Sequence, residues 1–252
     1  MARVIAVSNL KGGSAKSTTT IVVGAELAAT GHPTLLIDLD GQGHLAEGFG
    51  IDALSLDHDI SEVLDGTLSL QHVVQPLRPN LYLAPSNLHL AYMEPRIITR
   101  MGRETLLRKA LEPMLPNFDY VLLDCPPSVG IYTVNAFVAA SEVLVPMTAD
   151  YFSLIGVSML LKALTEVRLG LGHDAKVLGI VPTRVSRNRV SQDVVEEAKR
   201  KLASTHRIFT PIPEGVAVRE SAAAGKPVTE YAPSSKPAEA YRALTKDILN
   251  AS

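Results

Sequence analysis

Short apolar runs rich in β-branched residues alternate along this chain with longer segments in which apolar residues recur at helical spacing. The clearest apolar runs cover residues 4–8, 34–38, 120–124, 143–146 and 177–181, with a weaker run at 81–84. They are almost continuously apolar, which is typical of strands covered on both faces. The segments between them predict helices over residues 17–30, 104–115, 132–140, 153–169, 191–204 and 237–249. Strands that alternate with helices predict an α/β fold, with a doubly wound, mostly parallel sheet flanked by helices.

The segment 41–96 is less regular, and we expect it to hold short helices around the weak strand. No internal repeat, low-complexity tract or linker divides the chain. We therefore expect residues 1–252 to form a single domain.

Composition narrows the class of protein. Hydrophobic residues make up 46% and charged residues 20% of the 252, which is a soluble globular balance. Cys125 is the only cysteine, which excludes an internal disulfide or a redox pair and favours a reducing cytoplasm. No apolar stretch approaches the ~20 residues of a spanning helix. The net charge of −2 means that any nucleic-acid surface must be a local patch.

Candidate chemistry begins directly after the first predicted strand, where residues 8–18 read SNLKGGSAKST and lead into the first predicted helix. Glycines let backbone N–H groups surround phosphate oxygens, and the start of a helix adds free donors and a favourable dipole. In this context Lys16 would reach the β- and γ-phosphates, and the Ser17 hydroxyl would bind Mg²⁺. The alternative is a glycine turn that merely caps a buried helix.

The loop does not fit the ordinary pattern G-x-x-x-x-G-K-[ST], because Leu10 and Ala15 stand where it requires glycine. It fits K-G-G-x-x-K-[ST], and here the chain resembles the ParA/MinD family of deviant Walker ATPases. The resemblance implies that ATP is held by Lys11, Gly12, Gly13, Ser14, Ala15, Lys16, Ser17 and Thr18. It also implies a homodimer in which Lys11 reaches the phosphates of the partner. Family members usually have glycine in place of Ala15, and alanine suits that position only if its φ is negative.

Three aspartates follow predicted strands at the edge where a nucleotide would bind. Asp38 and Asp40 end the second strand, and alternation along a strand would point them the same way. The stretch is similar to the family's D-x-D-P-Q, with Gly41 replacing proline, which implies that Asp40 positions the attacking water and Asp38 supports Mg²⁺. Asp124 ends an apolar strand before a D-C-P-P-S run that matches the family and implies a second Mg²⁺ residue, with Cys125 only a packing residue. An ordinary turn or capping acid is the alternative for each.

The resemblance continues through the second half of the chain. It implies that Thr183 and Pro213 frame the adenine, although ordinary loop positions explain them equally well. Residues 220–241 look like the family's run E-A-P-x-x-G-K-P-V-x-x-Y-x-P-x-S-x-x-A-x-A-Y.

DNA binding in the family depends on basic residues exposed on the dimer. The candidates here are Lys199, Arg200, Arg219, Lys226 and Lys236. Lys199 and Arg200 fit a solvated helix face equally well. Glu214 and Ala217 occupy positions that are often basic in ParA proteins, so DNA affinity could be weak or differently placed.

Three functions compete. The first is a cytoplasmic, nucleoid-associated ParA-type ATPase, dimeric with ATP and Mg²⁺, that binds DNA non-specifically and is stimulated by a ParB-like adaptor to partition or position a cargo. The second is a membrane-cycling switch like MinD, which needs an amphipathic basic helix at the C-terminus; we expect the last helix to dock instead, with no membrane partner. The third is a metabolic enzyme, either a dethiobiotin synthetase-like ligase or a nitrogenase iron protein-like reductase; a reductase needs cluster cysteines that one cysteine cannot supply.

Overall fold

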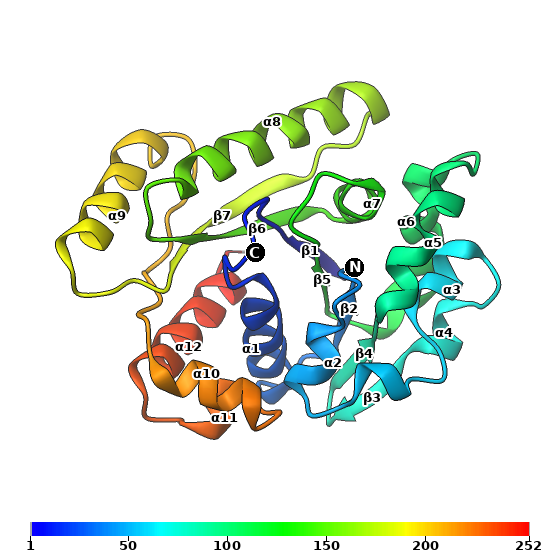
Figure 1. Ribbon diagram of the computed structural model, residues 1–252, viewed down its shortest axis with the longest axis horizontal. Coiled ribbons are helices and arrows are strands. Elements are labelled where there is room, and N and C mark those ends of the chain that lie inside the picture. The colour runs from blue at the N-terminus through cyan, green and yellow to red at the C-terminus, as the bar shows by residue number, and fades with distance from the viewer. Residues whose placement is uncertain (1, 252) are drawn as a thin grey trace.

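The apolar runs lie side by side in one seven-stranded sheet, and the computed structural model describes residues 2–251 (Figure 1). The strands are β1 (Arg3–Val7), β2 (Thr34–Asp38), β3 (Gln75–Arg78), β4 (Leu81–Ala84), β5 (Tyr120–Asp124), β6 (Glu142–Thr148) and β7 (Lys176–Thr183). Their order is β3-β4-β2-β5-β1-β6-β7, and every neighbouring pair is parallel except β3 with β4. The predicted doubly wound, mostly parallel sheet is confirmed.

The antiparallel strand β3 was not predicted from the sequence. It contains Pro76, which has no N–H to donate to a ladder. Its sequence, QPLR, has neither a continuous apolar run nor a regular alternation of apolar and polar residues. Proline is tolerated here because β3 lies at the edge of the sheet, where one side of the strand has no neighbour.

Helices connect the strands on both faces of the sheet. They are α1 (Lys16–Ala29), α2 (His44–Gly48), α3 (Ile60–Asp65), α4 (Leu70–Val73), α5 (Leu88–Ile98), α6 (Leu106–Leu111), α7 (Ile131–Ala139), α8 (Ser153–Leu171), α9 (Arg189–Leu202), α10 (Val216–Ala223), α11 (Val228–Tyr231) and α12 (Lys236–Leu249). Short 3₁₀ turns cover Ala53–Ser55, Arg103–Thr105 and Glu112–Asn117.

The single helix predicted over 104–115 is wrong. The segment is a 3₁₀ turn, then α6, then a second 3₁₀ turn. Pro113 and Pro116 have no N–H for an i to i−4 bond, and their rings clash with the preceding turn, so the α-helix ends at Leu111.

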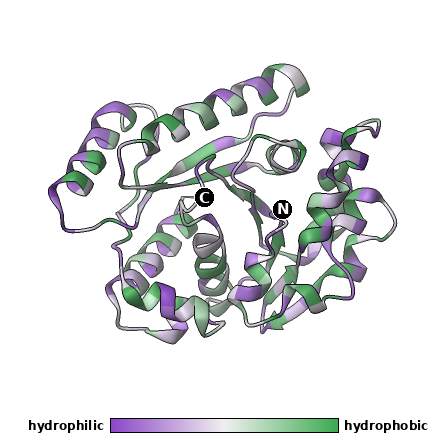
Figure 2. Ribbon diagram, viewed as in Figure 1, coloured by the Kyte–Doolittle hydropathy of each residue, from purple (hydrophilic) through white to green (hydrophobic). Residues whose placement is uncertain are grey.

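Two hydrophobic clusters fill the space on either side of the sheet. Side chains alternate along β1, so Val4 and Ala6 join one cluster while Ile5 and Val7 join the other. The first cluster packs under α3 and α5 to α8, and the second under α1, α2 and α12 (Figure 1). Hydrophobic residues concentrate in the strands between these layers (Figure 2). Within residues 2–251, no helix combines the length and apolar character needed to cross a membrane.

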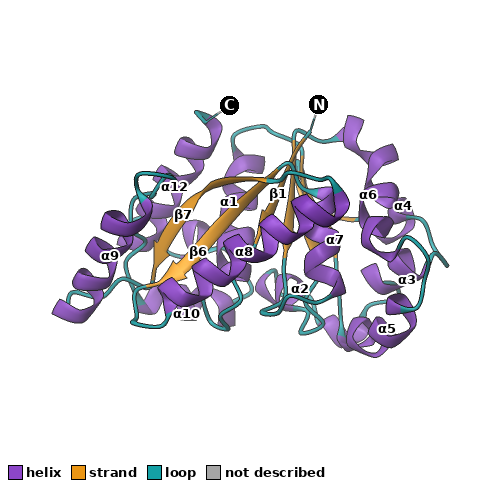
Figure 3. Cartoon of the chain, turned by 90° about the horizontal axis from the view of Figure 1, so that it is seen from above, coloured by secondary structure: helices purple, strands orange, loops and turns teal. Residues whose placement is uncertain are grey.

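The register of the central strands sets the position of the site. Asp124 of β5 lies opposite Val7 of β1 on one side and opposite Asp38 of β2 on the other. The carboxyl ends of three parallel strands are therefore level with one another. Loops from these ends, and from β6 and β7, meet at one edge of the sheet (Figure 3).

Candidate active site

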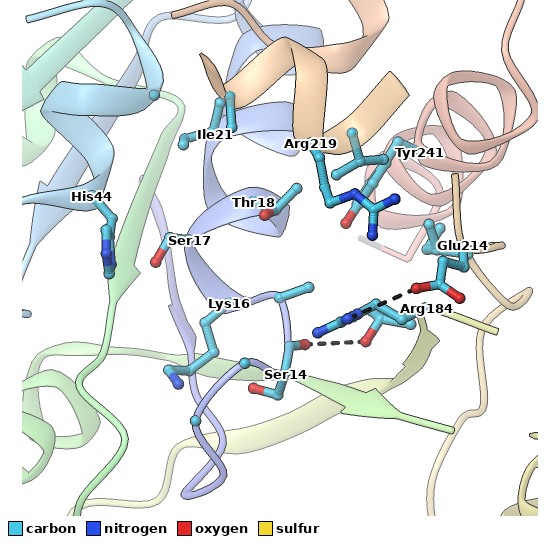
Figure 4. Close-up of a pocket in the computed structure, with 18 of the residues that line it drawn as sticks. Ser14, Lys16, Ser17, Thr18, Ile21, His44, Arg184, Glu214, Arg219 and Tyr241 are labelled. Carbon is cyan, nitrogen blue, oxygen red and sulfur yellow. Dashed lines mark hydrogen bonds and ion pairs between the residues drawn. The ribbon is translucent and has the colours of Figure 1, made fainter. Parts of the chain in front are cut away.

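A cavity of about 600 Å³ opens at this edge of the sheet (Figure 4). Its floor is the loop 12–15 with the first two turns of α1, and its walls are α2 on one side and the loop 212–215 with α10 on the other. Of the predicted residues, the cavity is lined by Gly12, Gly13, Ser14, Ala15, Lys16, Ser17, Thr18, Asp40, Thr183, Pro213 and Arg219. Lys11, Asp38 and Asp124 are not among the lining residues.

The loop that begins the cavity is anchored by a buried asparagine. Asn9 Nδ2 donates to the Pro146 carbonyl at 2.7 Å, and its Oδ1 accepts from the Lys11 N–H at 3.1 Å. Thr183 Oγ1 donates to the Ser14 carbonyl at 3.1 Å from the other side. The loop is therefore held between β6 and β7, which leaves its amides free to face the cavity.

Ala15, immediately before α1, has φ +67° and ψ +30°. The sequence allowed alanine here only with a negative φ, so this condition is not met. An L-residue with a side chain in the left-handed region costs roughly 1–2 kcal/mol. The loop thus has the backbone conformation that glycine adopts easily, and the Cβ of Ala15 makes this conformation strained.

Lys16 is the most buried lysine of the site, with 7% of its surface exposed. Its Nζ donates to the Lys11 carbonyl at 3.4 Å. Burial lowers the pKa of Lys16, against the opposing effect of the Asp124 and Asp40 carboxylates. An ammonium group held this far from water by a single weak hydrogen bond suits an anion placed within the loop.

Two fully buried carboxylates, Asp38 and Asp124, stand next to each other at the ends of β2 and β5. Burial, and then the Asp124 charge, raise the pKa of Asp38 well above its usual range. Burial, together with the nearby Asp40, raises the pKa of Asp124 to about 7, although the Ser17 side chain and Lys16 oppose this. A cation beside the pair would relieve the repulsion.

The polar atoms around this pair suit a hard cation such as Mg²⁺. Asp124 Oδ2 is buried and has no hydrogen-bond partner. Asp124 and the Ser17 hydroxyl together offer the oxygen ligands that Mg²⁺ prefers. Among the described residues there is no group of three or more His, Cys, Asp or Glu side chains fit to hold a metal. Mg²⁺ commonly uses one or two carboxylates and takes its other ligands from phosphate and water.

Asp38 and Asp40 do not point together as expected. β2 ends at Asp38, so the alternation of a strand does not extend to Asp40. The Asp38 carboxylate instead accepts from the backbone N–H groups of Asp40 and Leu45, both at 3.0 Å. Asp40 lines the cavity, and its Oδ1 accepts from the Gln42 N–H at 3.1 Å. Asp38 therefore shapes the loop from behind, and Asp40 is the carboxylate that faces the cavity.

Lys11 points away from the cavity and toward the start of α8. Its Nζ forms an ion pair with Asp150 and donates to Ser153 Oγ at 3.4 Å. Burial alone would raise the pKa of Asp150, but hydrogen bonds from Lys11, Thr148 and Ser153 outweigh it and lower the pKa. The sequence analysis missed Asp150 because it lies 139 positions after Lys11 in the chain. The two residues come together only because β6 lies beside β1 in the sheet.

The end of the cavity away from Lys16 is mostly apolar. It is lined by Ile21, Ile212, Val218, Ala222 and Tyr241, none of which was predicted. Thr183 is 1% exposed and its hydroxyl is committed to the Ser14 carbonyl, so its first role here is to fix the loop. Arg184 and Glu214 also line the cavity and were missed as site residues. Cys125 is fully buried and burial raises the pKa of its thiol, in keeping with a packing residue.

Four of the five predicted DNA-contacting residues fall into two groups, and the fifth, Arg219, lines the cavity. Lys199 Nζ lies 2.8 Å from Glu196 Oε1, and Arg200 pairs with Glu197, so both cations are balanced by carboxylates on α9 itself. Lys226 and Lys236 are exposed near the ends of α10 and α12, and within residues 2–251 neither is paired with a carboxylate. Arg219 points into the cavity (Figure 4).

Comparisons with known proteins show which family the chain resembles. A family model described as an AAA domain (AAA_31) matches residues 2–177. The sporulation initiation inhibitor protein Soj of Bacillus subtilis is 34% identical over 251 residues, covering 98% of each chain. The chromosome partitioning protein ParA of Myxococcus xanthus is 36% identical over 98% of this chain and 88% of that protein.

A solved structure is also similar over nearly the whole chain. It is described as cobyrinic acid a,c-diamide synthase from Mycobacterium smegmatis with bound ATP analogue and magnesium. It is 33% identical, has a TM-score of 0.87, and covers 99% of this chain and 95% of its own.

The strain at Ala15 generates a stability prediction. Replacement of Ala15 by Gly should raise the free energy of unfolding by about 1 kcal/mol, because the left-handed backbone no longer carries a Cβ. Urea denaturation measures this change. As a control, Ala203→Gly, at a helix end with φ −67°, should lower stability by roughly 0.5–1 kcal/mol. A loss of stability in both variants would contradict the strain argument.

Proposed function

The chain belongs to the ParA/MinD family of P-loop ATPases, and from this membership we propose that it is a ParA-type ATPase that partitions or positions a cargo. With ATP and Mg²⁺ it forms a homodimer that binds DNA non-specifically on the nucleoid. A ParB-like adaptor stimulates hydrolysis, which separates the dimer and releases it from DNA. The cargo is a plasmid, a chromosome region or a protein body. Residues 1–252 act as one domain.

ATP and Mg²⁺ fit the site. The loop 11–18 surrounds the triphosphate with backbone N–H groups, and the buried Lys16 ammonium contacts the β- and γ-phosphates. Ser17 and Asp124 hold Mg²⁺, with Asp38 behind them. When bound there, Mg²⁺ would neutralise part of the negative charge of the phosphates. The orphaned Asp124 Oδ2 is the observation in favour of this ion.

Hydrolysis requires positioning and charge stabilisation more than covalent chemistry. Asp40 is the carboxylate on the cavity wall, so it is suited to orient the attacking water. Lys16 stabilises the charge that builds up on the transferred phosphoryl group. Asp38 keeps the 38–45 loop in register through its two backbone hydrogen bonds, which maintains Asp40 in place.

The second lysine of the loop carries the proposal of a dimer. Lys11 has no role in its own cavity, because its side chain lies at the start of α8 and is partly exposed. Tyr151 and Phe152, directly after Asp150, are 77% and 67% exposed and stack edge to face with ring centroids 5.5 Å apart. Apolar rings beside a lysine at the mouth of the site suit a surface that a second subunit covers. In the dimer Lys11 leaves Asp150 and reaches the phosphates of the partner.

A metabolic role is the second candidate, because one similar solved structure is described as a synthase. Four relatives described as Soj or ParA match 98–99% of the chain at 32–36% identity, which favours partitioning. A metabolic enzyme needs no ATP-dependent dimer and no affinity for DNA. Sedimentation therefore separates the two functions.

The central test uses Asp40→Ala with ATP and Mg²⁺. This variant should bind ATP and sediment as a dimer, while its turnover falls roughly 100-fold because the water is no longer oriented. It should also co-sediment with DNA at low salt and lose DNA at high salt. Lys16→Ala, which cannot hold the triphosphate, should stay monomeric. A monomeric Asp40→Ala protein that binds ATP would reject the partitioning function in favour of the metabolic one.

Asp150→Ala tests whether the resting ion pair competes with dimer formation. Without the carboxylate, Lys11 is free, so the ATP-bound dimer should form at about two- to fivefold lower protein concentration, as expected for a half-exposed pair of about 0.5–1 kcal/mol. Analytical ultracentrifugation measures the dissociation constant. Glu230→Ala, which removes a half-exposed carboxylate of α11 from its ion pair with Arg78, is the matched control and should leave the dissociation constant unchanged. A weaker dimer in Asp150→Ala would mean that Asp150 belongs to the interface.

We expect the two groups of basic residues to contribute differently to DNA affinity. Lys226→Ala and Lys236→Ala should each reduce the affinity of the ATP-bound dimer for DNA and reduce the salt dependence by about one counterion. Lys199→Ala should have a smaller effect, because Glu196 already balances that charge. Fluorescence anisotropy across a salt series measures both quantities. The opposite ranking would move the DNA surface to α9.

A further inference from the structure

Arg184, the first residue after β7, has an unusual backbone conformation. Its φ is +53°, and within residues 2–251 the only other non-glycine residues with positive φ are Ala15 and Asn80. Asparagine tolerates the left-handed region, whereas a long side chain such as arginine rarely enters it. Strain of this kind persists where the surrounding structure enforces it, and it clusters at binding sites.

The strained backbone turns the Arg184 side chain back over the cavity (Figure 4). Its Nη1 lies 3.8 Å from the point that a Cβ on Gly13 would occupy, so the guanidinium rests against the phosphate loop. Its Nη2 lies 3.8 Å from Glu214 Oε1 on the facing loop. The guanidinium of Arg184, which follows β7, thus lies beside the phosphate loop and is held there by Glu214.

Glu214 would be an unfavourable neighbour for a nucleotide if it faced the cavity alone, because its carboxylate would repel the phosphates. Its position is explained by Arg184. Backbone bonds tie the two loops together, with the Val185 N–H donating to the Ile212 carbonyl at 3.1 Å and the Glu214 N–H to the Val185 carbonyl at 3.0 Å. The ion pair spans these tied loops on the side of the cavity.

The pair is weak enough to exchange. The side chains are 55% and 46% exposed and the atoms are 3.8 Å apart, so the pair contributes little to stability. A phosphate accepts two parallel hydrogen bonds from a guanidinium and is a stronger partner than a distant carboxylate. Arg184 can therefore turn from Glu214 to a nucleotide phosphate with a small movement of its side chain.

We propose that Arg184 is a further nucleotide-binding residue, which contacts the phosphates of a nucleoside di- or triphosphate from outside the phosphate loop, and that Glu214 is its positioning residue. This rests on the ATP site proposed above. The contact is made within one subunit, so it acts on ADP in the monomer as well as on ATP in the dimer.

Calorimetric titration of the full chain with ADP and Mg²⁺ tests the contact. Arg184→Met keeps the length of the side chain and removes its charge, so the Kd for ADP should rise about tenfold. Arg187→Met, an exposed arginine three residues later that does not line the cavity, is the control and should leave the Kd unchanged. An unchanged Kd in Arg184→Met, with binding abolished in Lys16→Ala, would overturn the inference and leave the ATP site intact. Failure of the unaltered chain to bind ADP would instead reject the ATP site itself.

A double-mutant cycle tests the role of Glu214. If Glu214 positions Arg184, Glu214→Gln should weaken ADP binding two- to threefold in the unaltered chain and have no such effect in an Arg184→Met background. Glu47→Gln, another carboxylate that lines the cavity, should not show this coupling. Tighter ADP binding by Glu214→Gln would mean that the carboxylate only repels phosphate, and it would reject the positioning role.

Arg184→Gly separates stored strain from simple misfolding. Glycine adopts the left-handed region freely, so without nucleotide the variant should melt about 2–4 °C higher than the unaltered chain. Its Kd for ADP should nevertheless rise as in Arg184→Met. A lower Tm, or an unchanged affinity, would contradict the view that this strain serves nucleotide binding.

Discussion

The burial of two adjacent carboxylates is the physical constraint on which the site depends. Asp38 and Asp124 end neighbouring parallel strands in register, where neither is exposed, and burial raises the pKa of both. The fold tolerates this arrangement because two backbone N–H groups donate hydrogen bonds to the Asp38 carboxylate. The Ser17 side chain and the Lys16 ammonium stabilise the charged form of Asp124. One oxygen of Asp124 still has no partner. In the function proposed here, a cation at this edge of the sheet would supply the missing partner.

Each of three cationic side chains in and beside the cavity is paired with a group of the protein itself. Lys16 is bonded to the Lys11 carbonyl at 3.4 Å, Lys11 to Asp150 and Ser153, and Arg184 to Glu214 at 3.8 Å. Each has an internal partner that an arriving phosphate can replace. In the function proposed here, nucleotide binding exchanges these internal contacts for contacts with ATP, first within one subunit and then, through Lys11, between two. A small set of charge exchanges would thus couple the nucleotide to assembly.

Most of the fold could be predicted from the sequence because most of its strands are continuous apolar runs and four of its helices, α1, α8, α9 and α12, are 14 to 19 residues long. The residues of the phosphate loop could also be predicted, since they are contiguous in the chain and form a recognisable motif. What could not be predicted depends on backbone geometry or on distant contacts. The left-handed φ of Arg184 has no local signal in the sequence, and that of Ala15 was suggested only by the glycine that related sequences usually have there. The Lys11–Asp150 pair exists only because β6 lies beside β1. Asp38 lies behind Asp40 because β2 ends at Asp38, two residues before the position that an alternating pattern would have to reach. Pro113 was the one clear local signal that the predicted helix over 104–115 neglected.

The most direct measurement is a crystal structure of the Asp40→Ala protein with ATP and Mg²⁺. The account predicts a triphosphate enclosed by residues 11–18, Mg²⁺ beside Ser17 and Asp124, and Lys11 withdrawn from Asp150 onto the phosphates of a second subunit. A triphosphate bound elsewhere, or a closed dimer in which Lys11 still pairs with its own Asp150, would contradict it.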